Sequence, residues 1–435
     1  MDRMIVALNG IEVGSLERHR SGAMSFRYLS DWLVRPGARP LSLSLPLSEQ
    51  HYQGERVYNF FDNLLPDSIA IRTRIQARFN TATSQPFDLL SSIGRDCVGA
   101  IQLYPDGPDG VEIPPVDRIT ATPVDDLTIA GILAGYEHAP LGLGGDDEDF
   151  RISLAGAQEK TALLWYEGGW QRPHGSTPTS HIFKLPIGRI QHNGIDLSES
   201  VENEWLCQRI VQAFGLPVAP TELGQFGDQR VLIVTRFDRR WSRDGRWLMR
   251  LPQEDFCQAL GIAPALKYES DGGPGIAEGM QLLLGSQTPL QDRAHFFRAQ
   301  ILFWMLAAID GHAKNFSIFL EPDSAFRMTP LYDILSAHPL IAHGSLSAQK
   351  ARMAMGVHGR NRHYRWSEIL PRHFEHTAQS IAFSARIARE IMADMKARTG
   401  EVIHAVSAQL PSGFSAQISD AILTGLRVQA ARLPD

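Results

Sequence analysis

The stretch 301–320, ILFWMLAAIDGHAKNFSIFL, contains one polar island between two apolar runs. The island holds an acid, an imidazole, an ammonium and an amide, at Asp310, His312, Lys314 and Asn315. Apolar runs of this kind are typical of buried elements, whereas a buried polar group costs free energy unless it is paired. We therefore expect the island to carry a function rather than to fill a core.

The polar island has the spacing of a kinase catalytic loop. Four residues separate Asp310 from Asn315, and a further acid, Asp333, follows in LYDILSA. In protein kinases such an Asp takes the proton of the acceptor hydroxyl, the Asn binds metal, and the later Asp holds the Mg²⁺ that bridges the phosphates. All three side chains carry the oxygen ligands that Mg²⁺ prefers. The spacing predicts phosphoryl transfer, although Ala308 and Ile309 stand where kinases have His and Arg.

The other half of a kinase site is predicted earlier in the chain. Lys184 lies in HIFKLP, a short apolar segment of strand type, from which a lysine can reach phosphate oxygens. Glu204, with Glu202 as a competitor, lies in a segment of helical spacing and is the expected carboxylate partner of the lysine. Upstream, SLAGAQEK offers small residues whose backbone N–H groups suit phosphate, but it is neither GxxxxGK[ST] nor GxGxxG.

Each of these residues also has an ordinary structural explanation. Asp310 and Asp333 could cap helices, Asn315 could sit in a turn, and Gly156 could belong to a hairpin. An ionised lysine on a buried strand is harder to explain in this way, because it needs a partner. The order of the signals along the chain is loop, strand Lys, helix Glu, strand, Asp-x4-Asn and a later Asp. This is the order of a two-lobed kinase, and it favours a phosphotransferase.

Composition restricts the class of protein. The 435 residues are 43% hydrophobic and 21% charged, which predicts a globular chain with two or three cores. A net charge of -6 argues against a protein that coats nucleic acid on its own. The three cysteines show no CxxC spacing, so we expect neither a disulfide framework nor a thiolate metal site. MDRMIVALNG lacks the apolar core of a signal peptide, and the run 301–309 is too short to span a bilayer. We expect a cytoplasmic protein with no membrane partner.

The chain divides into three predicted regions, of mixed α/β, strand-rich and helical character. Residues 1–108 begin with MIVALNGIEVGSLER, a hairpin pattern around an Asn-Gly pair. Residues 109–240 contain strand candidates and one helix candidate, at 151–170 (a hairpin), 181–186, 198–217 (the helix) and 230–241. Residues 241–435 are mainly of helical type. The predicted fold class is α+β, a two-lobed protein-kinase-like fold with a mixed α/β N-terminal subdomain and a mainly helical C-terminal lobe.

Longer blocks of the sequence resemble the HipA family of serine/threonine kinase toxins, over essentially the whole chain. The early blocks are RPLSLSLPL, FFDNLLPDS and PFDLLSSIGRDCVGA. The later blocks are FRISLAGAQEKTALL, HIFKLPIG, RFDRRW, MRLPQEDFCQALG, KYESDGGPGIA, DGHAKNFSIF and LYDILSA. Several of these blocks are too long to match by chance.

The resemblance implies roles for particular residues of this chain. Asp310 matches the family's catalytic base, Asn315 and Asp333 match its Mg²⁺ ligands, and Lys184 matches the lysine that contacts ATP phosphates. Further nucleotide contacts are implied for a phosphate loop, a hinge beside the adenine and the neighbourhood of the catalytic loop. These residues are Ala155, Gly156, Ala157, Gln158, Glu159 and Lys160; Thr235, Arg236 and Phe237; and His312, Ala313, Lys314 and Tyr332. A member of the family has a Glu where Thr235 stands, which puts a side-chain contact to adenine there in doubt but not ATP binding.

The resemblance also implies self-inhibition. Ser153 matches the serine that these kinases autophosphorylate, in preference to Ser180 or Ser198. A phosphoserine adds close to two negative charges, which beside a loop that receives ATP phosphates would repel them. An ordinary strand serine is the alternative.

The partners implied by the resemblance are a HipB-type helix-turn-helix antitoxin, operator DNA and an aminoacyl-tRNA synthetase, glutamyl-tRNA synthetase foremost. Phosphorylation of the synthetase would slow translation and lead to growth arrest and persistence. The basic segment 343–366 is either a DNA-backbone contact within the antitoxin complex or a solvated loop and helix face. Two other functions stay open, a small-molecule kinase of the aminoglycoside or lipid type and a non-enzymatic co-repressor. Intact Lys184, Asp310, Asn315 and Asp333 count against the second.

Overall fold

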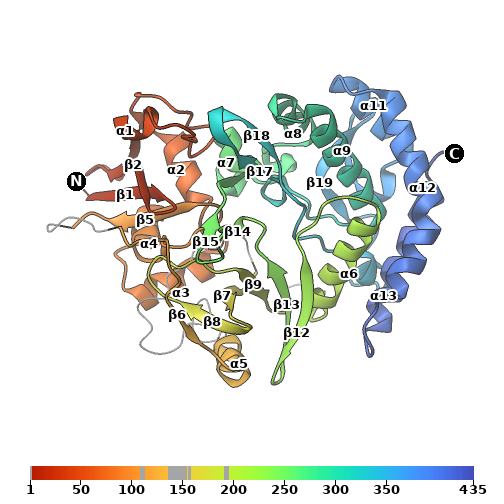
Figure 1. Ribbon diagram of the computed structural model, residues 1–435. Helices are drawn as coiled ribbons and strands as arrows, with labels where there is room; N and C mark the ends of the chain where they lie inside the picture. Colours follow the sequence, from red (N-terminus) through yellow and green to blue (C-terminus); the bar gives the residue numbers. More distant parts are fainter. Residues whose placement is uncertain (1, 108–112, 136–153, 155–157, 191–194) are drawn as a thin grey trace. The chain divides into compact units, whose positions relative to one another are not determined.

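The computed structural model describes residues 2–107, 113–135, 154, 158–190 and 195–435 (Figure 1). These residues form two compact units. The first unit contains Met1–Leu185, Gly224–Ala265 and Ile318–Phe326, and the second contains Pro186–Leu223, Leu266–Ser317 and Arg327–Asp435. Each unit is assembled from segments that lie far apart in the sequence, and the predicted boundaries at residues 108 and 240 stay predictions.

An antiparallel sheet of five strands opens the first unit, in the order β4-β3-β2-β1-β5. Its strands are β1 (Asp2–Leu8), β2 (Ile11–Arg18), β3 (Met24–Tyr28), β4 (Tyr52–Gln53) and β5 (Ile101–Pro105). Asn9 and Gly10 join β1 to β2 with φ values of 48° and 74°, the conformation that a two-residue hairpin turn requires. The hairpin predicted from this pair is confirmed.

Four helices share a core with this sheet. They are α1 (Ser30–Leu33), α2 (Glu55–Asp62), α3 (Ile69–Phe79) and α4 (Pro86–Ile93). Val6 and Phe26 of the sheet are fully buried together with Phe60, Phe61 and Leu90 of the helices. Since burial of one such side chain contributes about 1.5–3 kcal/mol, this core stabilises the N-terminal region substantially. The region has the mixed α/β character that the sequence predicted.

A second sheet, of six strands in the order β12-β13-β9-β7-β8-β6, carries the segment around Lys184. Its strands are β6 (Ala121–Pro123), β7 (Lys160–Tyr166), β8 (Gly169–Pro173), β9 (His181–Lys184), β12 (Thr221–Phe226) and β13 (Gln229–Thr235). Helix α5 (Asp126–Ala134) adds Ile129 and Leu133 to its core. The predicted glycine-loop hairpin is β7 and β8, with the turn at Glu167 and Gly168, and the predicted strand around Lys184 is β9.

The prediction of one strand over 230–241 was wrong, because the segment forms two strands. After β13 ends, the chain turns through residues 236–238, and β14 (Arg239–Trp241) then pairs with β15 (Leu248–Arg250). Arg236 and Asp238, in the turn, are both 4% exposed and form an ion pair of 2.7 Å. The turn brings these charged side chains to buried partners. The alternation of apolar residues along 230–241 does not show where such partners lie, so it does not predict the turn.

The N-terminal motif 39–47 is hydrogen-bonded to a later part of the first unit, β16 (Gln253–Asp255) and α7 (Phe256–Leu260). The Ser44 hydroxyl donates to the carbonyl of Gln258 at 2.8 Å. The N–H of Leu43 donates to the carboxyl of Glu254 at 2.8 Å. The motif 39–47 is therefore bonded to the segment 253–260 within the first unit, and the buried acid Glu254 takes part in this contact.

Glu254 makes the stability of the protein depend on pH. It is 0% exposed, and burial raises its pKa from 4.5 to about 8 although the Ser42 and Leu43 hydrogen bonds act in the opposite direction. The unfolded chain therefore releases this proton at a lower pH than the folded chain. The stabilisation that Glu254 contributes is fully present below its pKa in the unfolded chain. It is lost as the pH rises towards its pKa in the folded chain, by at most about 1.4 kcal/mol per pH unit.

We expect Glu254→Gln, which retains an acceptor for the Leu43 N–H, to gain stability relative to wild type as the pH rises from 5 to about 8.5. Urea denaturation at several pH values measures this difference. A difference between the two proteins that is the same at every pH would show that the folded Glu254 does not hold its proton.

The second unit is mainly helical. Its α-helices are α6 (Ser200–Ala213), α8 (Ile276–Leu282), α9 (Pro289–Met305), α10 (His338–Ala342), α11 (Pro371–Ser380), α12 (Ala385–Ser407) and α13 (Ala416–Ala430). The helix predicted within 198–217 is confirmed as α6, although Glu199 rather than a serine occupies its N-cap position. In the described part of the chain, no helix combines the length and the apolar character that crossing a bilayer requires.

Of the two interpretations of the basic segment 343–366, a solvated loop and helix face was wrong, while a DNA-backbone contact stays a prediction. It forms the hairpin β19 (Arg352–His358) and β20 (Arg362–Arg365). Met353, Met355 and Val357 of β19 are buried, so the strand belongs to the core of the unit. Short strands elsewhere are β10 (Gly188–Ile190), β11 (Ile195–Leu197), β17 (Ser317–Leu320) and β18 (Phe326–Met328).

Candidate active site

The polar island follows the buried last turn of α9 and is held by two remote segments. The carbonyl of Ala307 accepts a hydrogen bond from the N–H of Ala337 at 2.9 Å. The carbonyl of Ile309 accepts one from the N–H of Ala354 in β19, also at 2.9 Å. Asp310 is therefore presented on a fixed backbone, and its side chain is exposed. A carboxylate that is exposed and held on a fixed backbone is suited to contact a substrate.

The residues after Asp310 form a short 3-10 turn, η6 (Ala313–Asn315), which brings Asn315 to Asp333. The amide Nδ2 of Asn315 donates to Oδ2 of Asp333 at 3.1 Å, and its Oδ1 accepts from the N–H of His312 at 3.3 Å. Asp333 has a φ of 60°, an uncommon conformation that is often found at functional sites. Two of the predicted site residues, 18 positions apart in the sequence, are thus in contact.

Tyr332 and Lys314 support this pair through the backbone of the turn. The Tyr332 hydroxyl donates to the carbonyl of Lys314 at 2.8 Å and lies 2.5 Å from the hydroxyl of Ser317. His312 and Lys314 are only 6% and 7% exposed. The structure thus gathers the predicted residues Asp310, 312–315, Tyr332 and Asp333 in one unit, around the polar island.

The oxygen ligands of this cluster fit a magnesium ion. Among the described residues, no group of three or more His, Cys, Asp and Glu side chains could hold a metal. Mg²⁺ does not need such a group, because it is commonly bound by one or two protein ligands together with waters and substrate phosphates. The Asp333 carboxylate and the Asn315 amide, in contact with each other, supply that kind of partial ligand set.

Lys184 lies at the end of β9 in the first unit and is 7% exposed. In the sheet it stands opposite Lys160 of β7 on one side and Leu232 of β13 on the other. Two lysines thus stand on facing positions, where like charges destabilise a sheet unless opposite charge lies near them. The strand position predicted for Lys184 is confirmed, while its phosphate contact stays a prediction.

Ala155, Gly156 and Ala157 of the predicted phosphate loop lie outside the described residues, as does Ser153, the predicted autophosphorylation site. The structure describes the end of the loop, which contacts two other segments of the first unit. The amide of Gln158 donates to the carbonyl of Leu185, next to Lys184, at 2.5 Å. Glu159 forms an ion pair with Arg74 of α3. The loop therefore joins β7 at a place fixed by β9 and by the N-terminal region.

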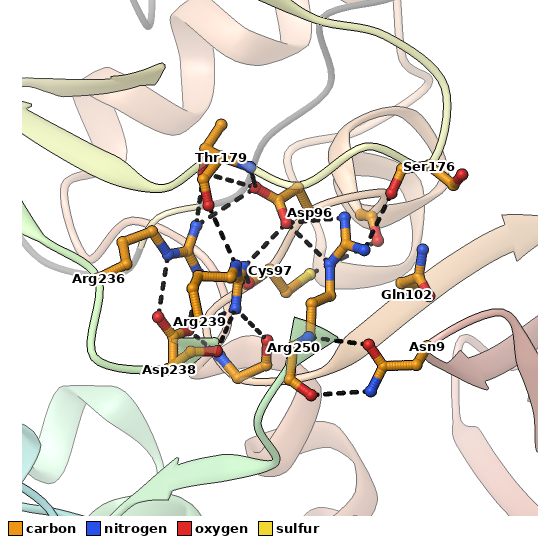
Figure 2. A network of polar contacts seen from close by, with 12 residues as sticks. Asn9, Asp96, Cys97, Gln102, Ser176, Thr179, Arg236, Asp238, Arg239 and Arg250 are labelled. Atoms are coloured by element: carbon orange, nitrogen blue, oxygen red, sulfur yellow. Dashed lines mark hydrogen bonds and ion pairs between the residues drawn. The ribbon is translucent and has the colours of Figure 1, made fainter. Parts of the chain in front are cut away.

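The predicted hinge contains an arginine whose side chain contacts protein groups. Thr235 ends β13, and the N–H of Arg236 donates to the carbonyl of Ser180 at 2.9 Å. The Arg236 guanidinium donates to Asp238 at 2.7 Å and to Asp96 at 3.3 Å (Figure 2). The contacts of this side chain are structural, and the hinge assignment itself stays a prediction for the backbone of 235–237.

Figure 2 shows a buried network built from three arginines and two aspartates. Asp96 accepts from Arg239 at 2.9 Å and from Arg250 at 3.0 Å. Burial opposes the ionisation of Asp96, but the guanidinium groups of Arg239, Arg250 and Arg236 outweigh it and hold the pKa of this carboxyl well below its usual range. The network fixes the N-terminal region against the turn that follows Thr235.

Glu204 lies on α6 in the second unit and is 1% exposed. It accepts a hydrogen bond from the amide of Gln208 at 3.1 Å. Its neighbour Asn203 donates to the carbonyl of Ser336 at 2.8 Å, so α6 is bonded to the segment that follows Asp333. Lys184 belongs to the other unit, and the predicted pairing of Glu204 with Lys184 stays a prediction.

Sequence reasoning did not identify Tyr268 as a site residue. Its hydroxyl donates to Oδ1 of Asp310 at 2.6 Å. The residue belongs to KYESDGGPGIA, a block that signalled the family resemblance but suggested no chemistry. Asp96 and Asp238 of the buried network were missed in the same way, because nothing local marks a carboxylate whose partners are distant in the sequence.

The chain is similar to known proteins in sequence and in fold. The family described as "HipA-like C-terminal domain" matches residues 152–403, and "HipA N-terminal domain" matches 4–104. The chain is 36% identical to the "Putative kinase Y4mE" of Sinorhizobium fredii, over 79% of this chain and 78% of that one. It is 27% identical to the "Serine/threonine-protein kinase toxin HipA" of Shewanella oneidensis, over 71% of this chain and 69% of that one.

A solved structure agrees with these relatives in fold. It is described as the "Shewanella oneidensis MR-1 Toxin Antitoxin System HipA, HipB and its operator DNA complex" and is similar over 99% of this chain and 97% of that chain, with a TM-score of 0.81 and 21% identity. The predicted kinase-like α+β fold is thereby confirmed. Because the C-terminal family match alone covers more than half of the 435 residues, this chain belongs to the HipA family of serine/threonine-protein kinases.

Proposed function

We propose that this chain transfers the γ-phosphoryl group of ATP to a serine or threonine hydroxyl of a protein, with Asp310 as the base. The observation that carries the proposal is the contact of 3.1 Å between Asn315 and Asp333, in a loop that also presents an exposed Asp310. These are the residue types and the chain order that a kinase site needs. Membership of the HipA family supports the same reaction.

In the proposed step, the oxygen of the acceptor hydroxyl forms a bond to the γ-phosphorus. The bond between that phosphorus and the oxygen bridging it to the β-phosphate breaks, and ADP leaves. The hydroxyl proton passes to the carboxylate of Asp310. Asp310 also orients the hydroxyl, so its contribution is positioning as well as proton transfer.

Asp333 and Asn315 would hold Mg²⁺, which when bound neutralises charge on the phosphates. Lys184, which stands opposite Lys160, would contact phosphate oxygens from the sheet of the first unit. Glu204 would orient Lys184. The loop from Ala155 to Lys160 would contact the phosphates through its backbone N–H groups. The further nucleotide contacts proposed are those of residues 235–237, 312–314 and 332.

We propose further that the chain is the toxin of a HipBA-type module. The supporting observations are the 27% identity to a named HipA toxin and the fold of a HipA solved with HipB and operator DNA. A helix-turn-helix antitoxin of the HipB type is therefore the proposed partner, and the pair would act as a co-repressor on operator DNA. The proposed substrate is an aminoacyl-tRNA synthetase, glutamyl-tRNA synthetase first, whose phosphorylation would arrest growth.

The decisive experiment is mass spectrometry of the protein after incubation with Mg-ATP. We expect one added phosphate, located on Ser153 by peptide mapping, because the serine lies just before the proposed phosphate loop. Ser153→Ala should abolish this phosphate, while the matched control Ser198→Ala should retain it. A phosphate found at another residue in wild type would overturn the assignment of Ser153.

The acceptor class is tested with purified aminoacyl-tRNA synthetases beside a set of aminoglycosides, using γ-labelled ATP. Transfer of label to a synthetase, on serine or threonine, is the expected result. Transfer to an aminoglycoside and to no protein would overturn the protein-kinase proposal in favour of a small-molecule kinase. Failure of the wild-type protein to bind ATP in calorimetry would leave the co-repressor as the better account.

A further inference from the structure

The segment 267–275 lies along the catalytic loop through several contacts of different kinds. The Tyr268 hydroxyl donates to Oδ1 of Asp310 at 2.6 Å, and the Tyr268 ring packs edge-on against the ring of His312, with 5.1 Å between the ring centroids. The carbonyl of Lys267 accepts from the N–H of Ala313 at 3.2 Å. Contacts to Asp310, His312 and Ala313 mean that the segment follows the loop rather than touching it at a single point.

One strand, β19, holds both the segment and the loop in place. The N–H of Ala354 donates to the carbonyl of Ile309, the residue before Asp310, at 2.9 Å. Two residues further along the same strand, the N–H of Gly356 donates to the carboxylate of Glu269, the residue after Tyr268, at 2.5 Å. Because alternate strand residues have the same orientation, β19 positions Tyr268 and Asp310 relative to each other.

Glu269 makes the segment rigid. Its side chain is 4% exposed and forms an ion pair of 2.7 Å with Arg362 of β20. The chain passes close to this carboxylate at Gly275, where an added Cβ atom would lie 2.2 Å from Cδ of Glu269, so a larger residue there would force the carboxylate to shift. A buried, paired and tightly enclosed anchor next to Tyr268 leaves the tyrosine little freedom to leave Asp310.

We propose that Tyr268 is a positioning residue for the catalytic base, through the hydrogen bond from its hydroxyl to Asp310. The inference rests on the proposed function, in which Asp310 accepts the proton of the acceptor hydroxyl. A carboxylate has two oxygens and about four lone-pair sites, so it can accept from Tyr268 and from a substrate hydroxyl at the same time. The bond to Oδ1 restricts rotation of the carboxylate and aims it at the acceptor.

The test is the variant Tyr268→Phe, which keeps the ring against His312 and removes only the hydroxyl. The rate of autophosphorylation is measured by intact mass at increasing Mg-ATP concentrations, on the whole chain. We expect the maximal rate to fall on the order of tenfold, the scale of one lost hydrogen bond to a charged group, with the half-saturating ATP concentration and the melting temperature unchanged. The matched control Tyr58→Phe removes a hydroxyl that donates to Gln85 at 2.7 Å and should retain the wild-type rate.

A second variant separates a positioning role from a general structural one. If Tyr268 acts through Asp310, then adding Tyr268→Phe to Asp310→Asn should reduce the residual rate no further. A further reduction in the double variant, or a wild-type maximal rate in Tyr268→Phe alone, would overturn the inference. A wild-type rate in Asp310→Asn alone would instead refute the proposed base, so the two failures are distinguishable.

Discussion

Replacement of Asp310 by Asn is expected to lower the rate of phosphoryl transfer by about 10²–10⁴-fold, the usual contribution of a general base. The substitution retains the shape of the side chain and an oxygen that can accept the hydrogen bond from Tyr268, but it removes the group that takes the proton. ATP binding should be unchanged, because the residues proposed to hold the phosphates and Mg²⁺ are others. Rates measured by intact mass and ATP affinity measured by calorimetry give the two quantities.

The control for this variant is Asp420→Asn, which neutralises an exposed acid on α13. It should transfer phosphate at the wild-type rate. If Asp310→Asn retained that rate as well, another group would have to accept the proton. If it lost ATP binding together with activity, Asp310 would serve the nucleotide site rather than the acceptor.

The second large effect is expected at Asp96, where Asn should lower the free energy of unfolding by about 3–5 kcal/mol, the range measured when one partner is removed from a buried ion pair. Asp96 is 4% exposed and accepts hydrogen bonds from Arg239, Arg250, Arg236 and Thr179. Without its charge, Arg250 loses the carboxylate with which it pairs, and Asp238 alone remains to pair with Arg236 and Arg239 (Figure 2). Urea denaturation measures the loss.

Glu368→Gln serves as the control, since it removes one partner of an ion pair of 3.0 Å with Arg365 that is more than half exposed on both sides. Its effect should stay below about 1 kcal/mol, as is usual for surface pairs. Similar losses in the Asp96 and Glu368 variants would mean that the buried network contributes no more than a surface contact.

The effect of Asp96→Asn should also depend on pH. The arginines hold the pKa of Asp96 below its usual range, so its contribution to stability is present above the unfolded pKa, near 4. The contribution is lost as the pH falls towards the lower folded pKa. The free energies of unfolding of wild type and Asp96→Asn should therefore converge as the pH is lowered below about 4. A difference that remained constant down to pH 2 would show that Asp96 is not ionised in the folded protein.

Local chemistry explains what could be predicted from the sequence alone. The Asn9-Gly10 turn depends on two residues that tolerate positive φ, and the strand around Lys184 depends on its own apolar neighbours. The contact of Asn315 with Asp333 could be anticipated because kinase chemistry prescribes residue types and order, not only shape. Each of these signals is carried by a short stretch or by a motif of known spacing.

The misjudged elements were those whose conformation depends on distant partners. The segment 230–241 has the pattern of one strand, but Arg236 has to meet Asp96, which lies 140 positions away, and the chain turns there. The basic composition of the segment 343–366 suggests a solvated surface. The side chains of Met353 and Met355 are buried, however, so β19 belongs to the core of the second unit. Composition describes what a segment contains and not which of its faces is covered.

The sequence by itself therefore determined the family of this protein and the order of its candidate site residues: an acid, an amide and a second acid in kinase order, and a strand lysine. Only the tertiary structure decided how that chemistry is held. Tyr268 meets Asp310 across 42 positions, and β19 bonds to the neighbours of both. The physical reason is that a hydrogen bond or a buried ion pair depends on distance in space, which a linear pattern does not contain, whereas turn and strand preferences depend on adjacent residues.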